Sequence, residues 1–268
     1  MFIHDTILNR LKRGCETMKY PAAPAPALPD RHGGGLRVES TKCAPDCSAC
    51  VPVCPTGAIG MSPGQAITLD LGRCLFCAEC VRVCPSGAVT QTGDHRLAVR
   101  HREDLILGGA RREEVRLAAA LDRRLLGLFG RSLRLRQVSA GGCNACEADT
   151  NVLGTIGWDL GRFGIQFVAS PRHADGLLIT GPVSMNMALA LEKTYEALPD
   201  PKLVIAVGAC AIAGGPFAGH PQVNDGAGAL VPVDLFIPGC PPHPLTILDG
   251  LLRLLDRLED SRAKVTEA

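Results

Sequence analysis

The chain has 268 residues, of which 46% are hydrophobic and 21% charged, so we expect a folded core and, at this length, two domains. Its formal net charge of +1 excludes a global electrostatic attraction to nucleic acid, and no nucleic-acid partner is expected. Its 13 cysteines point to disulfides in an oxidising compartment or to metal binding in a reducing one.

The first residues predict no export signal. Asp5 falls where the uninterrupted apolar core of a signal peptide would run, and no pair of arginines lies near the start. The longest uncharged stretch, residues 203–219, contains several glycines and Pro216, so we interpret it as a buried strand and loop and expect no transmembrane span. The predicted compartment is the reducing cytoplasm, where clustered cysteines favour metal over disulfides.

Residues 1–37 are predicted to form a short helix and a linker. Ile7, Leu8 and Leu11 lie on one face of an amphipathic helix that ends at Gly14. The Pro/Ala-rich residues 21–29 that follow predict a stiff, extended linker with few backbone donors.

Residues 38–107 carry two compact cysteine runs. Each run ends in a related motif, Cys-Pro-Thr-Gly-Ala-Ile at 54–59 and Cys-Pro-Ser-Gly-Ala-Val at 84–89, which indicates an internal duplication. A repeat of this kind is typical of an α+β ferredoxin domain with two 4Fe–4S clusters. The cysteines of the runs are Cys43, Cys47, Cys50 and Cys54, then Cys74, Cys77, Cys80 and Cys84.

The spacing of the second run predicts how the ligands are shared. In this pattern the fourth cysteine points away from its own run and binds the neighbouring cluster. Cluster 1 is therefore expected to take Cys43, Cys47, Cys50 and Cys84. Cluster 2 is expected to take Cys54, Cys74, Cys77 and Cys80.

The first run departs from the usual spacing by one residue, because three residues (44–46) separate Cys43 from Cys47. We expect an enlarged loop around the same kind of cluster. A three-iron cluster at this site and structural zinc at the two runs are the alternatives.

Residues 108–132 predict a basic helical connector. Between Arg96 and Arg136 the sequence contains eleven arginines and five acidic residues. Helical spacing is shown by Leu117, Leu121, Leu125 and Leu128. The connector is either a solvated amphipathic helix or a docking surface for a partner subunit or an anionic membrane face.

Residues 133–268 alternate between short apolar runs and helical stretches, which predicts an α/β flavodoxin-like domain with a parallel sheet. The expected strands are 133–138, 165–169, 177–180, 203–207 and 235–237, and the clearest expected helices are 184–198 and 246–258.

Cys143 follows the first of these strands, Cys210 the fourth and Cys240 the fifth. Because parallel strands end at the same edge of a sheet, these cysteines can converge there.

The pair Cys143 and Cys146 has two interpretations. A Cys-x-x-Cys in a βαβ pattern is found in thioredoxin-like redox sites. Glycines flank these cysteines at 141–142, 208 and 239, however, and glycine lets backbone amides approach cluster sulfurs closely. The flanks therefore favour a third cluster.

Five segments carry a specific resemblance. They are Gly-Cys-Asn-Ala-Cys-Glu (142–147), Pro-Arg-His-Ala-Asp (171–175), Thr-Gly-Pro-Val (180–183), Val-Gly-Ala-Cys (207–210) and Val-Asp-Leu-Phe-Ile-Pro-Gly-Cys-Pro-Pro (233–242). Residues 130–255 closely resemble the small subunit of membrane-bound, energy-converting NiFe hydrogenases of the formate hydrogenlyase type, homologous to the 20 kDa subunit of respiratory complex I. Residues 1–107 resemble the two-cluster ferredoxin-like subunit of the same complexes, so the chain looks like a fusion of two subunits.

The resemblance implies that Cys143, Cys146, Cys210 and Cys240 hold the proximal 4Fe–4S cluster, the third in the chain. It further implies a NiFe-type large subunit, membrane-anchor subunits, and an electron donor or acceptor such as ferredoxin or a formate dehydrogenase. The chain would then be a peripheral subunit at the cytoplasmic face of the inner membrane. It would belong to an oxidoreductase complex without holding the NiFe catalytic site itself.

Four further residues have open roles. Glu147 either tunes the potential of the proximal cluster or assists proton movement, or it caps the following helix. His243, where complex I relatives typically carry arginine, either acts on the cluster or is a structural or surface residue. His173 is expected in a turn, with redox-linked protonation as the alternative, and Cys15 is a thiol without a redox role.

Three functional alternatives remain. One is a complex I-like subunit that passes electrons to quinone; the separation of Cys143 from Cys146 argues for the hydrogenase side, because complex I relatives have two adjacent cysteines there. Another is a subunit of a hydrogenase-related complex whose large subunit lacks nickel. The third, a free-standing multi-cluster electron carrier, leaves a whole α/β domain devoted to one cluster unexplained.

Overall fold

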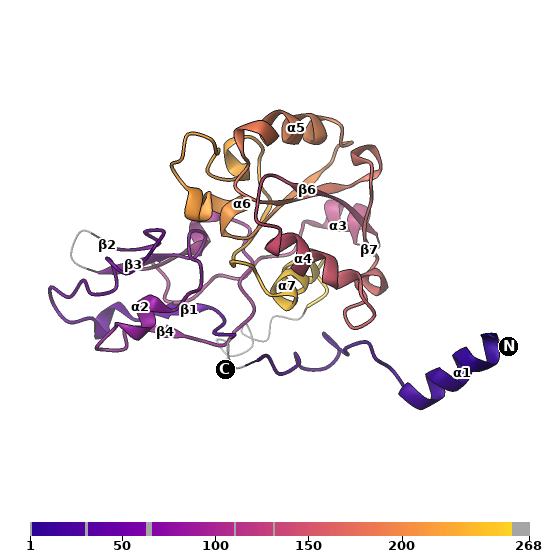
Figure 1. The fold of residues 1–268 in the computed structure, drawn as a ribbon, viewed down its shortest axis with the longest axis horizontal. Helices are drawn as coiled ribbons and strands as arrows, with labels where there is room; N and C mark the ends of the chain where they lie inside the picture. The colour runs from indigo at the N-terminus through magenta and orange to yellow at the C-terminus, as the bar shows by residue number, and fades with distance from the viewer. Residues whose placement is uncertain (1, 30–31, 63–65, 110, 131, 259–268) are drawn as a thin grey trace.

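The computed structural model describes residues 2–29, 32–62, 66–109, 111–130 and 132–258. Two small antiparallel sheets and one five-stranded parallel sheet organise the chain (Figure 1). The smaller sheets lie in the cysteine-rich part of the chain and the parallel sheet in the second half.

The cysteine-rich part is built from short elements around tight turns. Strands β1 (Leu36–Val38) and β4 (Val89–Gln91) pair antiparallel, and β3 (Ile67–Asp70) pairs antiparallel with both β2 (Ile59–Met61) and β5 (Ile106–Gly108). The only regular helix among them, in the described residues, is the single turn α2 (Glu79–Arg82). This part therefore combines short strands with a helical turn, as an α+β domain does.

The parallel sheet confirms all five predicted strands to within two residues. Its strands are β6 (Leu133–Ser139), β7 (Ile165–Phe167), β8 (Gly176–Thr180), β9 (Leu203–Val207) and β10 (Leu235–Ile237). They lie in the order β10-β9-β8-β6-β7, which is 2-1-3-4-5 from the β7 edge when numbered within the domain. Every neighbouring pair is parallel, so the carboxyl ends of all five strands share one edge.

Helices cover both faces of this sheet. They are α4 (Ala145–Asn151), α5 (Met185–Glu196), α6 (Ala209–Ala213) and α7 (Pro244–Leu254). Leu248 and Leu252 of α7 share a core with Ile205, whereas Leu191 of α5 packs with Leu177 on the opposite face. Figure 1 accordingly shows α5 on one side of the sheet, with α4 and α7 on the other. Burial on both faces explains why β8, β9 and β10 have largely apolar sequences. Strands β6 and β7 also carry exposed polar residues, such as Arg134 and Gln166.

The two parts are joined by backbone pairing. Val99 forms an antiparallel bridge with Phe236 of the edge strand β10; the Val99 amide donates to the Phe236 carbonyl at 3.0 Å and the Phe236 amide to the Val99 carbonyl at 2.9 Å. Ile212 and Phe236 are also buried in the core of the cysteine-rich part. The distance between the two parts is therefore set by a continuous core rather than by a loose linker.

The basic connector is helical over a shorter stretch than its leucine spacing predicts. Helix α3 spans only Arg123–Phe129 and begins at Asp122, whose carboxylate accepts a hydrogen bond from the Leu125 amide at 2.9 Å. Before this cap, the amides of Ala118 and Leu121 donate to the carbonyls of Ala98 and Leu254. The prediction of one longer helix was wrong because these backbone groups pair with other parts of the chain.

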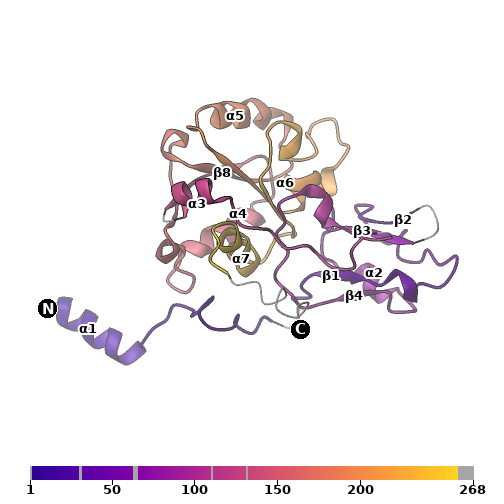
Figure 2. The same cartoon turned by 180° about the vertical axis from the view of Figure 1, so that it is seen from behind.

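The N-terminal helix α1 (Phe2–Arg13) ends before Gly14, as predicted, and lies apart from the rest of the chain in both views (Figures 1 and 2). The segment that follows it is bound to the second half. The Met18 amide donates to the Gly157 carbonyl at 3.0 Å, and Arg162 donates to the carbonyls of Met18 and Tyr20 at 2.6 and 2.7 Å.

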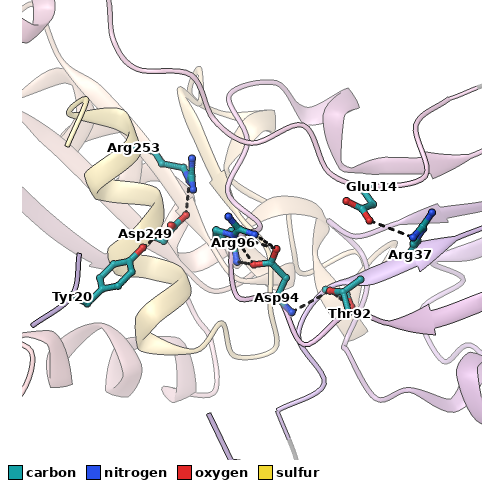
Figure 3. A network of polar contacts seen from close by, with 9 residues as sticks. Tyr20, Arg37, Thr92, Asp94, Arg96, Glu114, Asp249 and Arg253 are labelled. Carbon is teal, nitrogen blue, oxygen red and sulfur yellow. Dashed lines mark hydrogen bonds and ion pairs between the residues drawn. The ribbon is translucent and has the colours of Figure 1, made fainter. Parts of the chain in front are cut away.

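Tyr20 is the anchor of this N-terminal segment. Its hydroxyl donates to Asp249 of α7 at 2.9 Å, and Arg253 donates to the other oxygen of Asp249 at 2.8 Å (Figure 3). Asp249 is fully buried, and burial of the Tyr20 phenol together with the Asp249 charge raises the pKa of that phenol. The phenol therefore stays protonated and able to donate.

Candidate metal centres

The thiols of the first quartet come from both runs. Burial raises the pKa of Cys43, and the neighbouring thiols of Cys47 and Cys84 raise it further. Burial likewise raises the pKa of Cys50, again with a contribution from Cys84. Cys84 thus lies near the thiols of the first run, where the sharing rule places it.

The second quartet has the reciprocal arrangement. Burial raises the pKa of Cys74 to about 12 and that of Cys80 to about 11. Both are raised further by the thiols of Cys54, from the first run, and Cys77. Burial also acts on Cys54, but the backbone amides near residues 56–59 outweigh it and lower its pKa; the Ala58 amide donates to its sulfur at 3.2 Å.

The third quartet converges at the carboxyl edge of the parallel sheet. Burial raises the pKa of Cys146, and the thiols of Cys210, Cys240 and Cys143 raise it further. After β6, Cys143 lies just before α4 and Cys146 lies in its first turn. Cys210 lies in α6 after β9, and Cys240 follows β10. Three strand ends therefore bring these four thiols together at one edge.

Two glycines bring backbone against these sulfurs. Gly208 has φ +90°, and a Cβ there would lie 2.6 Å from the sulfur of Cys146; at Gly215, with φ +56°, it would lie 2.7 Å from the sulfur of Cys210. Any larger residue would intrude on the ligands and would adopt a strained backbone. The motif predicted the role of Gly208. Gly215 was missed, although the pair Gly214-Gly215 after Cys210 was a visible signal.

Gly141 and Gly142, which precede Cys143, have a different role. A Cβ on Gly142 would lie 3.0 Å from the Cα of Gly181, and one on Gly141 would lie 2.8 Å from the hydroxyl of Ser184. These glycines therefore let the loops after β6 and β8 approach each other, rather than opening a path to the sulfurs.

The quartets fit multinuclear clusters in their donor chemistry. Each brings four thiols into mutual electrostatic range, and backbone amides point at sulfurs, for example Phe76 to Cys74 at 3.3 Å. Among the described residues, no three His, Cys, Asp or Glu side chains are placed to hold a single metal ion. Thiolates around a 4Fe–4S cluster each bind a different iron, so they need not meet at one point.

Glu147 is buried and fastens α4 to the sheet. Its Oε1 accepts hydrogen bonds from the hydroxyls of Ser139 and Thr180, both at 2.6 Å, at the ends of β6 and β8. Burial alone would raise the pKa of this carboxyl, but these two hydroxyls and its own amide outweigh burial and lower it. The ionised Glu147 contributes to the raised pKa of Cys146, so its charge reaches the third quartet.

The stability effect of Glu147 is a testable consequence. Glu147→Ala leaves two hydroxyls without their acceptor, and we expect it to lower the free energy of unfolding by about 3 kcal/mol. Glu147→Gln keeps an acceptor and should lose about 1 kcal/mol. Because folding lowers the pKa of Glu147, its ionic contribution is complete at neutral pH and declines as pH falls below about 4.

Unfolding followed by circular dichroism between pH 7 and pH 3 measures both effects. The difference between wild type and Glu147→Gln should shrink towards pH 3. An alanine variant as stable as wild type at pH 7 contradicts the anchoring role.

Cys15, His173 and His243 are the remaining residues whose roles the sequence left open. Cys15 is exposed, and backbone and Arg10 interactions lower its pKa. His173 is exposed in the turn Pro171–His173, as predicted. His243 caps helix α7.

Together, a cysteine-rich α+β domain with two interleaved thiol quartets and a parallel α/β domain with a third define an iron–sulfur electron-transfer protein. Residues 42–88 match the family model of the 4Fe-4S dicluster domain, and residues 143–254 match that of the NADH ubiquinone oxidoreductase 20 kDa subunit. The chain belongs to the family of this 20 kDa subunit and carries a ferredoxin-like domain ahead of it.

Three curated relatives illustrate the range of the family. The probable membrane-bound hydrogenase subunit mbhJ of Pyrococcus furiosus is 43% identical over 50% of this chain and 80% of its own length. An NADH-quinone oxidoreductase subunit of Heliobacterium modesticaldum is 41% identical over 44% of this chain and 69% of its own length. Formate hydrogenlyase subunit 7 of Escherichia coli is 42% identical over 53% of this chain and 55% of its own length.

Proposed function

We propose that this chain is the electron-transfer subunit of a membrane-associated NiFe hydrogenase complex and relays electrons through three 4Fe–4S clusters. Cluster 1 is held by Cys43, Cys47, Cys50 and Cys84. Cluster 2 is held by Cys54, Cys74, Cys77 and Cys80, and the proximal cluster by Cys143, Cys146, Cys210 and Cys240. When bound, such clusters supply reversible electron transfer, and the protein sets their positions and potentials.

The observation that carries this proposal is that the second quartet borders the first quartet and shares a cavity with the third. The thiol of Cys50, in the first quartet, adds to the raised pKa of Cys80 in the second, so these two sites are neighbours. Phe76, from the loop of the second quartet, lines the same cavity as Cys240 of the third. Electrons therefore enter or leave at cluster 1, cross cluster 2 and reach the proximal cluster.

The proximal end has the surface that a partner subunit needs. Cys143 and Cys240 are exposed, as are Met185 at the start of α5 and Phe217 after α6. Exposed apolar side chains beside a redox site mark an interaction surface. We assign it to a NiFe-type large subunit, where protons are reduced to hydrogen or hydrogen is oxidised.

Helix α1 supports a peripheral attachment to the membrane-anchor subunits. Ile7 and Leu11 are 54% and 76% exposed on a helix that also carries Arg10 and Arg13. In the described part of the chain, no helix has the length and apolarity to cross a bilayer. We place the chain on the cytoplasmic face of the inner membrane, with ferredoxin or a formate- or CO-oxidising module as its electron partner.

We also infer that the second domain has the flavodoxin-like fold. Its strand order 2-1-3-4-5 and its helices on both faces support this inference. The domain boundaries we propose are residues 38–107 for the ferredoxin-like domain and 133–268 for the second, joined by the connector at 108–132.

A quinone-linked complex I-type role is the second candidate, because an NADH-quinone oxidoreductase subunit is among the relatives. The Cys-x-x-Cys spacing of Cys143 and Cys146 favours the hydrogenase role instead.

Purification of the tagged full chain from detergent-solubilised native membranes tests the proposal. We expect a large subunit to copurify with nickel, and the chain itself to carry about twelve irons as three 4Fe–4S clusters. A large subunit without nickel supports the quinone-linked or nickel-free alternatives. A chain recovered alone from the soluble fraction with all three clusters supports a free electron carrier.

A further inference from the structure

The loop that leads into the second quartet packs directly against the helix that carries a ligand of the third. Gly72 lies two residues before Cys74, and Ile212 lies two residues after Cys210 in α6. A Cβ on Gly72 would lie 2.8 Å from the Cγ2 atom of Ile212, which is closer than a Cβ can approach without a shift of its neighbours. Ligand-bearing segments of two quartets, one from each domain, therefore touch at this point.

An ion pair braces the loop at this contact. Asp70, the last residue of β3, accepts from the Gly72 amide through one carboxylate oxygen at 2.9 Å and from Arg102 through the other at 2.6 Å. The guanidinium of Arg102 also lies against Gly72, where a Cβ would come within 2.7 Å of its Cζ atom. Asp70 thus holds both the backbone of Gly72 and the guanidinium beside it, and a shift of either one strains these hydrogen bonds.

Helix α6 is confined as well. Ala211 and Ile212 are buried in the same core as Cys74. A Cβ on Gly226 would lie 2.8 Å from the carbonyl oxygen of Ala211, so a further loop packs closely on the backbone of this helix. Close-packed interiors transmit a displacement to their neighbours rather than absorb it. A displacement at this contact therefore reaches a ligand of the second or of the third quartet.

Space, rather than backbone conformation, is what requires glycine at position 72. Gly72 is not among the described glycines with positive φ, so alanine could adopt its backbone conformation without strain. The added Cβ would instead push Ile212 and Arg102 away from the loop. Because the rate of electron tunnelling falls exponentially with the distance between donor and acceptor, even a small displacement of this kind slows electron transfer.

We propose that Gly72 is a positioning residue: its close contact with Ile212, braced by Asp70, sets the spacing between cluster 2 and the proximal cluster and thereby the rate of electron transfer between them. This inference rests on the proposed function, because it assumes clusters at the second and third quartets. The step moves one electron between the reduced and the oxidised cluster of this pair. No bond forms or breaks, and no proton is transferred.

The test is to enlarge this contact in the purified complex. Electron paramagnetic resonance of the fully reduced complex measures the magnetic coupling between the two clusters, which falls as their distance grows. Freeze-quench spectra after a flash of photoreduction follow electrons from cluster 2 to the proximal cluster. Gly72→Ala overpacks the contact and should weaken the coupling and slow the transfer several-fold. The midpoint potentials should stay unchanged, because the substitution alters neither charge nor the hydrogen bonds to the sulfurs.

Two further variants and a control complete the series. Ile212→Ala reduces the same contact and should strengthen the coupling, because the loop and α6 can then approach each other. The double variant Gly72→Ala with Ile212→Ala should return towards the wild-type coupling. Gly60→Ala is the control in strand β2 of the same domain, where a Cβ would lie at an ordinary 3.8 Å from the Thr68 hydroxyl. It should change neither the coupling nor the rate.

A Gly72→Ala complex with the wild-type coupling and the wild-type rate overturns the inference. Slower transfer with a shifted potential and an unchanged coupling overturns it as well, because the driving force and not the spacing would then have changed. If Gly72→Ala does not fold, the coupling in Ile212→Ala should exceed that in the double variant, and equal values overturn the inference. A wild-type complex without a third cluster overturns the proposed function instead.

Discussion

Replacing Cys84 with alanine is expected to remove the cluster of the first run and to leave that of the second run in place. Cys84 belongs to the second run in sequence, but its thiol contributes to the raised pKa of Cys43 and Cys50. Iron per chain should fall from about twelve to about eight, because one 4Fe–4S cluster is lost. Iron analysis together with electron paramagnetic resonance of the remaining clusters measures this.

Two matched variants test whether each cysteine run supplies its fourth ligand to the cluster of the other run. Cys54→Ala should remove the other ferredoxin-type cluster, since its thiol lies with Cys74 and Cys80. Cys15→Ala removes an exposed thiol outside the quartets and should leave the iron content unchanged. If Cys84→Ala instead removes the cluster of Cys74, Cys77 and Cys80, the ligands are not shared between the runs.

Replacing Asp249 with alanine should destabilise the chain more than any other single change to its polar network. Asp249 is fully buried, accepts from Tyr20, and pairs with the buried Arg253 (Figure 3). Its removal breaks the buried ion pair with Arg253, and loss of one partner of a buried pair costs about 3–5 kcal/mol. Denaturant unfolding of the apo chain, followed by circular dichroism, measures the loss.

Graded controls separate the buried charge from the hydrogen bond. Tyr20→Phe removes one hydroxyl and should cost about 1 kcal/mol. The double variant Asp249→Leu with Arg253→Met removes both charges and should recover most of the stability that Asp249→Ala loses. An Asp249→Ala protein that unfolds at the same denaturant concentration as the wild-type protein contradicts this account.

The fold was largely predictable where the signal is local. Strands β8, β9 and β10 are short, largely apolar runs next to Gly or Pro, because strands buried on both faces need few polar residues. The leucine spacing in 117–128 misled for the opposite reason. Its backbone donors are taken by Ala98 and Leu254, which lie far away in sequence, so the helix is limited to α3.

The candidate sites, like the fold, were predictable only where the signal lies in neighbouring residues. The two ferredoxin-type quartets depend on spacings of a few residues, so their membership can be predicted from one run and its repeat. The anchoring of Glu147 by Ser139 and Thr180 could not be predicted in this way, because it requires the ends of two adjacent strands. The only available signal was a hydroxyl residue at each strand end.

By itself the sequence determined how eight cysteines group into two runs and the order of the strands that precede the others. Both follow from short-range covalent geometry and from the burial of apolar runs. Only the tertiary structure decided what lies beside the ligands and in the core: Gly215 against Cys210, Asp249 beside Tyr20, and His32 against His243. Tyr20 and Asp249, like His32 and His243, are far apart in the sequence and meet only in the folded chain. Gly215 follows Cys210 closely and meets its sulfur because α6 ends between them. The grouping of eight cysteines into two runs is thus a local property of this chain, whereas the surroundings of the third quartet are a property of the folded whole.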